Sequence, residues 1–313
     1  MVKSEKIESP VVDGAVAERV GEIDRERIVR RYMEGYGVDV SEYFAGLATA
    51  DIYECNATGY RFYHPFSLTG KEHLYRELEK TTDGTYKDDK WEYREALSFI
   101  PGSCRVLDVG CGKGAFVVLA NQAGHETTGL ELNSASAMEA RQRGIDVRTE
   151  LIADHANKNS PAYDCVCSFQ VLEHIPDVKP FLDSCLSVLR PGGLLILGVP
   201  NNGGFVGLDP DAVLNMPPHH MGLWTEESLT ALTHFFPLSL RAIRFEPLEE
   251  LNWYASVMER RALSNSVAQA IYYKLGISHL FRMWVRLRKS KIHGHTIMAV
   301  FQKADEAKPT NPR

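Results

Sequence analysis

The residues best suited to chemistry are three glycines at alternate positions, Gly110, Gly112 and Gly114, which follow the apolar run 105–109. Glycine adopts backbone angles that other residues avoid, and it lets a ligand approach the main chain without meeting a Cβ atom. A helix is expected directly after the third glycine, and its N-terminal amides would favour a polar or anionic ligand group. The pattern predicts a ligand-binding loop between a strand and a helix.

Two acidic residues accompany this loop. Asp108 precedes the first glycine by two positions, and Glu131 ends the next expected strand, where a carboxylate can accept hydrogen bonds from a ribose. A dinucleotide-binding loop would carry its third glycine one position later, and Asp108 would repel a pyrophosphate. S-adenosylmethionine has both an ammonium group and a ribose, so it fits the pair better. A glycine turn with two incidental surface acids is the alternative.

Three histidines are the candidate general bases. His219 and His220 follow two prolines in the segment 216–224, which comes after the fifth expected strand. His174 follows the fourth expected strand, where Glu173 and His174 could instead cap the next helix. An imidazole takes up protons near neutral pH, because its reference pKa is about 6.5. We therefore predict a catalytic role for His219, His220 and His174; the alternative is that one histidine only fixes the loop.

The elements that must position these residues alternate between strands and helices from residue 104 to residue 201. Such alternation predicts βαβ units and a parallel sheet. The strand candidates are RVLDVG, TTGLEL, YDCVCSF and LLILGVP, and the helix candidates are AFVVLANQA, SASAMEARQR and VKPFLDSCLSVL. A tight turn is expected at 191–193, a capped helix after Thr225, a strand at 239–245 and a last strand at HTIMAVFQK.

Four motifs, in order over about residues 86–245, resemble those of the class I S-adenosylmethionine-dependent methyltransferases. They are VLDVGCGKG, LELN, YDCVCSFQVLEHIPD and LRPGGLLILGVPN. The resemblance implies an α/β fold: a doubly wound, mostly parallel, seven-stranded Rossmann-like sheet with an antiparallel last strand. It also implies S-adenosylmethionine as the cofactor and S-adenosylhomocysteine as the product, and we expect no metal.

The resemblance carries site roles to individual positions. Asp108, Gly110 and Gly112 would hold the methionine portion of the cofactor, and Glu131 would hold the ribose hydroxyls. The other residues assigned to cofactor binding are Cys111 and Gly114 in the loop, Leu132 near the adenine, Asp154 as an adenine contact, and Gln170 lining the cofactor site.

The texture of the chain predicts five parts. They are an N-terminal extension and aromatic cap segment (1–85), the methyltransferase core (86–250), a helical insertion before the last strand (251–292), the last core strand (293–304) and a solvated tail (305–313). Residues 1–30 are charged and are expected to form a frayed terminus or one surface helix. The cap is expected to be metal-free, because Cys55 alone cannot build a zinc site, and Tyr60, Phe62 and Tyr63 should cover the site or pack on the sheet.

The helical insertion carries an apolar stripe that must be buried against something, so we expect a lid or a homodimer surface there. Its basic stretch, 282–291, is open to three interpretations: a solvated face, a contact for an anionic acceptor, or a membrane-surface contact.

Composition excludes several classes. The 313 residues are 44% hydrophobic and 24% charged with a net charge of −6, which is typical of a globular chain and not of a general nucleic-acid binder. No apolar run is long enough to span a bilayer, and the first residues lack a signal-peptide core. Six cysteines without paired spacing predict reduced thiols and a cytoplasmic protein.

The sequence therefore favours a methyltransferase that acts on a small-molecule acceptor, with O-methylation of a sugar or secondary metabolite as the leading reaction. We expect this acceptor to be anionic or linked to a sugar. A catalytically silent S-adenosylmethionine-binding scaffold is one alternative. A nucleotide-dependent oxidoreductase is another, disfavoured by the glycine spacing.

Overall fold

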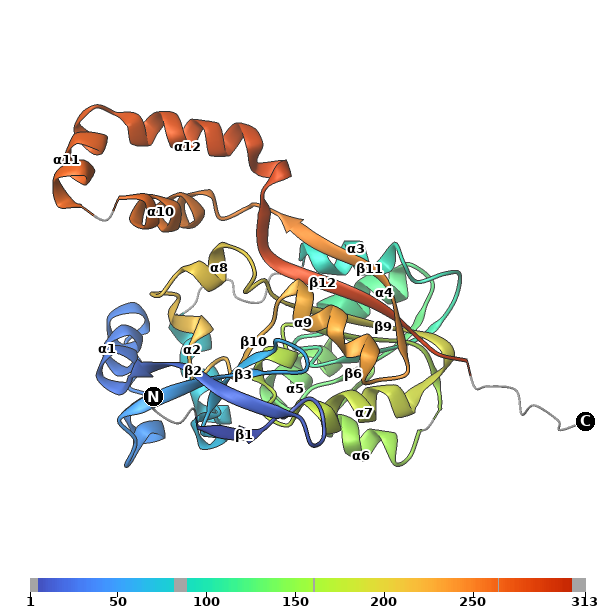
Figure 1. Cartoon of the computed structure of the whole chain (residues 1–313). Coiled ribbons are helices and arrows are strands. Elements are labelled where there is room, and N and C mark those ends of the chain that lie inside the picture. The colour runs from blue at the N-terminus through green and yellow to red at the C-terminus, as the bar shows by residue number, and fades with distance from the viewer. Residues whose placement is uncertain (1–4, 82–88, 160, 264, 306–313) are drawn as a thin grey trace, which may run out of the picture.

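The structure is a computed structural model that describes residues 5–81, 89–159, 161–263 and 265–305. It contains two sheets (Figure 1): a seven-stranded sheet in the order β11-β12-β9-β8-β5-β6-β7, and a five-stranded sheet in the order β1-β2-β3-β4-β10. The end of the predicted tail, 306–313, lies outside the described residues.

The seven-stranded sheet is mostly parallel, as the sequence predicts. Its strands are β5 (Arg105–Val109), β6 (Glu126–Leu130), β7 (Val147–Arg148), β8 (Tyr163–Phe169), β9 (Leu189–Pro200), β11 (Leu238–Pro247) and β12 (His293–Lys303). The pairs β5–β6, β5–β8, β6–β7 and β8–β9 are parallel, whereas β12 runs antiparallel to both β9 and β11. The predicted doubly wound fold with an antiparallel last strand is confirmed.

Both faces of this sheet are buried, which explains why its central strands are continuous apolar runs. Alternate residues along a strand point to opposite faces. Leu107 and Val166 belong to one apolar cluster, and their neighbours Val106 and Cys165 belong to another. The helices around the sheet are α3 (Trp91–Leu97), α4 (Ala115–Gln122), α5 (Ser134–Gln142), α6 (Ile152–Ala156), α7 (Val178–Val188), α8 (Phe205–Leu208) and α9 (Glu226–Ala231).

Local signals at the helix ends mostly act as predicted. Thr225 caps α9 in a reciprocal capping box with Ser228. The expected tight turn at 191–193 does not separate the helix from the strand, because α7 ends at Val188 and β9 begins at the next residue. Residues 191–193 form an irregularity inside β9, with Gly192 at φ 73°.

The N-terminal residues overturn the expectation of a frayed end or a single surface helix over 1–30. Of these, residues 5–30 form two strands of the second sheet and the beginning of a helix that follows them. Charged side chains pair across the strands of this sheet: Lys6 with Glu18 (2.7 Å) and Arg19 with Asp51 (2.9 Å). A sheet with one solvated face needs few apolar residues, so composition alone hid it. The elements are β1 (Lys6–Glu8), β2 (Val16–Asp24), α1 (Arg25–Tyr36), β3 (Thr49–Cys55), β4 (Arg61–His64) and α2 (Glu72–Thr81).

The fifth strand of this N-terminal sheet comes from the other end of the core. The strand β10 (Gly222–Leu223) follows β9 in the chain and pairs antiparallel with β4. Next to it, the ring of Trp224 lies 4.1 Å from the ring of Tyr60. Tyr60 and Phe62 pack in the main core cluster, whereas Tyr63 packs in the cluster under the N-terminal sheet. The two sheets are therefore joined through residues 222–224.

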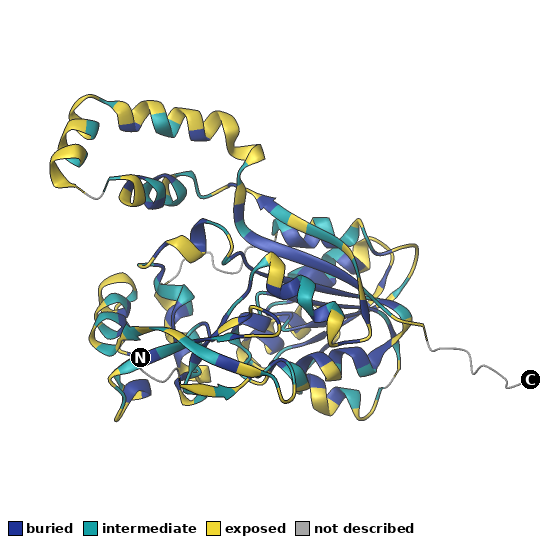
Figure 2. Cartoon of the chain, viewed as in Figure 1, coloured by how far each residue is buried: buried dark blue, intermediate teal, exposed yellow. Residues whose placement is uncertain are grey.

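The predicted helical insertion is present as α10 (Leu251–Ala262), α11 (Ser266–Lys274) and α12 (Ile277–Arg288), which stand away from both sheets (Figure 1). Most of α11 and α12 is exposed (Figure 2). Among the described residues, no helix has the length and apolar character needed to cross a membrane. All six cysteines are free thiols.

Trp224 should be a main stabilising contact between the two sheets, because its side chain is fully buried against Tyr60. We expect Trp224→Ala to lower the free energy of unfolding by about 3–5 kcal/mol through cavity formation. The matched control is Phe235→Ala, which removes a well-exposed aromatic ring and should cost less than about 1 kcal/mol. Urea unfolding monitored by circular dichroism measures both; similar losses for the two variants would contradict this role.

Candidate active site

The glycine loop after β5 has the backbone that its sequence predicts. Gly110, Gly112 and Gly114 all have positive φ angles, of 80°, 54° and 79°. A Cβ atom at Gly110 would overlap Cγ2 of Val171, and one at Gly114 would lie 2.7 Å from Cδ1 of Ile145. Both conformation and packing therefore require glycine at these two positions.

Glu131 holds this loop in place. Its Oε2 accepts a hydrogen bond from the Gly112 amide (2.8 Å), and its Oε1 accepts one from the Asn133 amide (2.6 Å). Burial raises the pKa of the Glu131 carboxyl. Each carboxylate oxygen can accept more than one hydrogen bond, so the group can also receive hydroxyl donors from a ligand.

Asp108 lacks the partner that a buried carboxyl needs. Its side chain is 2% exposed, and Oδ1 has no hydrogen-bond partner among the described residues. Burial, and next the charge of Glu131, raise the pKa of Asp108 to about 8. Because an unpaired buried polar group is costly, this position calls for a ligand group that donates hydrogen bonds or carries positive charge. The ammonium group of S-adenosylmethionine meets that requirement.

The other predicted cofactor residues vary in how closely the structure joins them to this loop. Cys111 is buried beneath the loop, whereas Leu132 is 56% exposed beside Glu131. Gln170 directly follows β8 and has φ 57°, and its side chain donates to Glu92 (3.5 Å). Asp154 is exposed on α6, and no hydrogen bond of the described residues joins it to the loop. Cofactor contacts by these residues remain predictions.

Glu92 and Lys90 belong to this region although the sequence did not single them out. Glu92 lies on α3, is buried, and has a pKa raised by that burial. The positive charge of Lys90 acts in the opposite direction and lowers the pKa of Asp108, Glu92 and Glu173. Glu92 and Lys90 lie in the run KWEY (90–93), whose two aromatic residues indicate packing and whose charges match none of the four family motifs.

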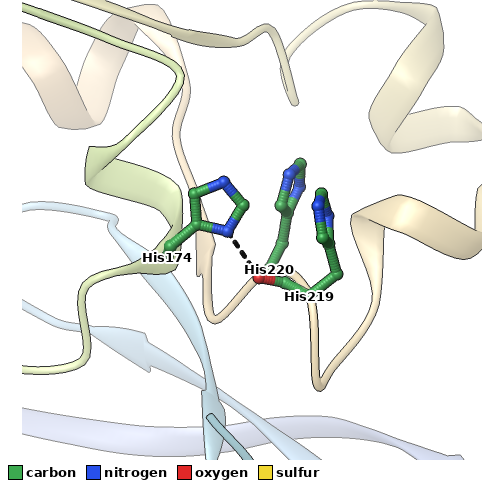
Figure 3. Close-up of side chains that lie close together, drawn as sticks. All are labelled: His174, His219 and His220. Atoms are coloured by element: carbon green, nitrogen blue, oxygen red, sulfur yellow. Dashed lines mark hydrogen bonds between the residues drawn. The ribbon is translucent and has the colours of Figure 1, made fainter. Parts of the chain in front are cut away.

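The structure brings the three predicted histidines together (Figure 3). The rings of His219 and His220 stack with centroids 4.6 Å apart. The ring of His174 comes from a different segment, directly after β8, and its centroid lies 4.7 Å from that of His219 and 4.8 Å from that of His220. We call these three residues the histidine cluster.

Hydrogen bonds define which nitrogen of each imidazole carries the proton. In every case Nδ1 faces an oxygen acceptor: the carbonyl of His219 for His174 (2.6 Å), the carbonyl of Leu214 for His219 (3.0 Å) and Oδ1 of Asn215 for His220 (3.3 Å). A neutral imidazole that donates from Nδ1 has a free lone pair on Nε2. This leaves Nε2 as the acceptor nitrogen of His219 and His220, whereas His174 has a second backbone hydrogen bond, to Gln170.

Burial keeps these rings neutral. It lowers the pKa of His174 to about 4 and that of His219 to about 3, and it also lowers the pKa of His220. For His219 and His220, the neighbouring imidazoles add to the effect. At neutral pH the histidine cluster therefore presents three uncharged imidazoles.

The backbone around His219 and His220 is held from both sheets. The Met221 amide donates to the Glu173 carbonyl (2.7 Å), and the Met221 carbonyl accepts from the Tyr63 amide (2.8 Å). The Gly70 amide donates to the Pro218 carbonyl (2.8 Å). The loop therefore depends on residues of the N-terminal sheet as well as on the core.

Glu173 points toward the histidine cluster. Its side chain is 1% exposed, and neither carboxyl oxygen has a hydrogen-bond partner among the described residues. Oε1 lies 3.9 Å from Nε2 of His174 and 3.9 Å from Nε2 of His220. Burial raises the pKa of Glu173 to about 8. The side chain therefore does not cap the next helix, which was the alternative role considered for it.

Comparison with known proteins identifies the family. Residues 72–254 match the family described as "Methyltransferase domain". This match covers more than half of the chain and includes the glycine loop, Glu131 and the histidine cluster. The chain belongs to this family and is an S-adenosylmethionine-dependent class I methyltransferase. The oxidoreductase and silent-scaffold alternatives are not supported.

Individual relatives are similar over shorter stretches. The chain is 36% identical over 95 residues to a ubiquinone biosynthesis O-methyltransferase of Vibrio parahaemolyticus, covering 28% of this chain and 40% of that protein. It is 32% identical over 106 residues to the protein of that name from Salmonella arizonae, covering 32% and 44%. The alignments span less than half the length of these relatives.

Solved structures of similar fold include an S-adenosylmethionine-dependent methyltransferase from Archaeoglobus fulgidus, with a TM-score of 0.48 and 18% identity over 75% of this chain and 95% of that one. A geranyl diphosphate C-methyltransferase from Streptomyces coelicolor, solved with Mg²⁺, geranyl diphosphate and S-adenosylhomocysteine, has a TM-score of 0.45 and 15% identity over 74% and 84% of the two chains.

Asp108 and Glu131 should support cofactor affinity more than folding. We expect Asp108→Asn and Glu131→Gln to weaken S-adenosylmethionine binding by about 10- to 150-fold, because each loses a hydrogen bond to a charged group. The control is Asp183→Asn on the exposed face of α7, which should bind as the wild type does. Titration calorimetry measures affinity and circular dichroism checks the fold; wild-type affinity in both site variants would refute the assignment.

Cofactor binding should release a proton at pH 7. Free Asp108 has a pKa of about 8 and is mostly protonated at that pH, whereas a bound ammonium group favours the carboxylate. Affinity should therefore rise with pH until about pH 8, and the release should vanish well above it. Calorimetry with S-adenosylhomocysteine in phosphate and in Tris detects the proton. An equal release from Asp108→Asn would assign it to another group.

Proposed function

We propose that this methyltransferase transfers a methyl group to a hydroxyl oxygen of a small-molecule acceptor, and that the histidine cluster promotes removal of the hydroxyl proton. The observation that carries the proposal is the set of three imidazoles that the fold brings together, each with Nδ1 against an oxygen acceptor. His174 lies four residues after Gln170, which directly follows β8, so the cluster and the predicted cofactor residues share one edge of the sheet. That edge is where ligands bind in sheets of this kind.

In this proposal, the residues around the glycine loop bind the cofactor and the histidine cluster acts on the acceptor. The bound cofactor supplies an electrophilic methyl group on a sulfonium. Asp108 and Glu131 would hold the polar ends of the cofactor, and the loop backbone would let it approach closely. A histidine of the cluster would accept the acceptor's proton at Nε2 as the oxygen lone pair forms the new bond to carbon. Positioning of the oxygen about 3 Å from the methyl carbon would supply much of the rate.

The charges near the cluster favour an uncharged acceptor. Glu92, Glu173 and Glu246 are buried, and each has a pKa raised first by burial. The charge of Glu92 adds to the rise for the other two, which shows that the three carboxyls sense one another. An anionic acceptor would be repelled whenever they ionise. A sugar or a hydroxylated secondary metabolite without negative charge fits better than the anionic acceptor first considered.

Two further observations bear on the acceptor. The curated relatives are named as O-methyltransferases, which supports oxygen as the acceptor atom. Arg282, the first residue of the basic stretch, donates to buried Glu259 (3.0 Å) and to Asn252 (3.2 Å). It has a structural partner, so it is less suited to receive an acceptor than the sequence suggested.

The helical insertion suits self-association. Four of the five large apolar side chains that α12 exposes follow heptad-like spacing, 3, 4 and 3 residues apart, which is the pattern of helices that pair along a seam. They are Ile277, Leu280, Trp284 and Leu287, and the fifth is Met283. We propose that this stripe packs against a second copy of the chain, and a lid role is the alternative.

Replacing the histidines should slow the chemical step and leave cofactor binding intact. For an acceptor that needs a base, we expect His219→Ala or His220→Ala to lower the single-turnover rate by about 10²–10⁴-fold. His234→Ala, which removes an exposed imidazole, is the control. Assays would use S-adenosylmethionine with catechol and methyl glycosides. Unchanged rates in both site variants and in the double variant would show that the cluster takes no part.

Disrupting the stripe should produce monomers. We expect Leu280→Glu and Leu287→Glu to reduce the mass measured by light scattering from that of a dimer to that of a single chain, because each buries a charge in an apolar seam. Val20→Glu, which charges an exposed site on β2, should leave the mass unchanged. A wild-type chain that is monomeric at micromolar concentration would rule out the dimer.

A further inference from the structure

The histidine cluster and Glu173 bring together four side chains of the kinds that bind metal ions. One ring nitrogen from each of His174, His219 and His220 lies within 4.8 Å of the others. Glu173 adds a buried carboxyl whose oxygens have no partner among the described residues, with Oε1 3.9 Å from Nε2 of two of these rings. A buried carboxyl without a hydrogen-bond partner is costly unless a ligand or a cation supplies the missing contact.

We propose that this cluster is a binding site for one divalent transition-metal cation, with zinc as the favoured ion. Three neutral imidazoles and a carboxylate form a ligand set typical of zinc in proteins. Imidazole nitrogen also binds copper, iron and nickel, whereas magnesium and calcium prefer oxygen ligands. The site therefore selects for the first group of ions by its chemistry.

The outer contacts of the three rings match those of metal-binding histidines. Such a histidine almost always donates its other N–H to a carbonyl or carboxylate, which fixes the ring and keeps the metal-facing nitrogen unprotonated. All three rings donate from Nδ1 to an oxygen of the protein, two of them to backbone carbonyls. This arrangement suits metal binding, because packing alone gives no reason to leave both oxygens of the buried Glu173 carboxyl without a partner beside three imidazoles.

The change needed to close the site is small. Zinc–nitrogen bonds of about 2.0–2.1 Å place tetrahedral ligands about 3.3 Å apart. The ring nitrogens, all within 4.8 Å of one another, can reach that spacing by rotation of the side chains. The hydrogen bond from the Met221 amide to the Glu173 carbonyl ties the two contributing segments together, so the backbone is already in place.

The consequence for the reaction rests on the proposed function. A cation held here would lower the pKa of an acceptor hydroxyl that binds to it, so that the proton leaves to solvent and no imidazole must carry it. The oxygen lone pair then forms the bond to the methyl carbon, and the carbon–sulfur electron pair stays on sulfur. This proposal replaces the expectation, drawn from the sequence, that no metal takes part.

The test is metal binding by the full chain after dialysis against EDTA. We expect calorimetry to show one high-affinity equivalent of Zn²⁺, and Co²⁺ to give a visible absorption band when added in its place. His220→Ala should weaken Zn²⁺ binding by more than about 100-fold, and the near-isosteric Glu173→Gln should weaken it by about 10- to 100-fold. Circular dichroism and S-adenosylhomocysteine binding check that each variant is folded.

Two controls separate this site from incidental metal binding. His234→Ala removes an exposed imidazole, and Cys104→Ser removes the one thiol that is not fully buried; both should retain the Zn²⁺ equivalent. Absence of the equivalent in the wild type, or its retention in both His220→Ala and Glu173→Gln, would overturn the proposal. Methyl transfer by EDTA-treated, metal-free protein would overturn the metal's role and leave the proposed function intact. Zinc binding without methyl transfer to any hydroxyl acceptor would support the metal site and contradict the proposed function.

Discussion

The backbone of residues 216–224 is the constraint on which the rest of the site depends. This segment leaves the seven-stranded sheet after β9 and supplies a strand to the N-terminal sheet through the pairing of Gly222 and Leu223 with β4. Trp224 then buries its ring against Tyr60. Because both ends of the segment are fixed by pairing and packing, His219 and His220 have little freedom to leave the position beside His174. The N-terminal sheet is thus part of the active-site framework.

The interior at this edge of the sheet is unusually polar for a buried region. Asp108 and Glu173 are almost fully buried without complete hydrogen bonding, and the imidazoles beside Glu173 are kept neutral by burial. Burying such groups opposes folding. Buried polar groups without partners are typical of sites where a ligand supplies the missing contact. The two unpartnered carboxyls here require different ligands. Asp108 calls for the ammonium group of the cofactor, and Glu173 with the histidine cluster calls for a cation or an acceptor proton.

The sequence predicted the parts of the fold that follow local rules. The order of strands and helices over 105–200 and the antiparallel last strand followed from apolar runs and from family motifs. The five-stranded N-terminal sheet could not be predicted, because its strands are charged and one of them, β10, has only two residues and pairs across more than 150 positions of chain. Long-range pairing of so short a strand leaves no periodic pattern to detect.

The same limit explains what was found and missed in the site. His174, His219 and His220 were selected one by one for their chemistry, and only the folded chain shows that they meet. Glu173 seemed a capping residue because its place after a strand suits that role; its lack of partners becomes visible only with burial. Glu92 and Lys90 lay in an aromatic run whose apolar character dominated the interpretation. Sequence identified the residue types, and tertiary contact determined their function.

The central claim is that three imidazoles stand neutral, each with its proton on Nδ1. Nitrogen-15 NMR of histidine-labelled, metal-free protein at pH 7 measures this tautomeric state directly, with assignment by single His→Ala variants. The account predicts that His174, His219 and His220 all give the chemical shifts of the Nδ1–H form. An Nε2–H tautomer, or a positively charged imidazolium, at any of the three would contradict it.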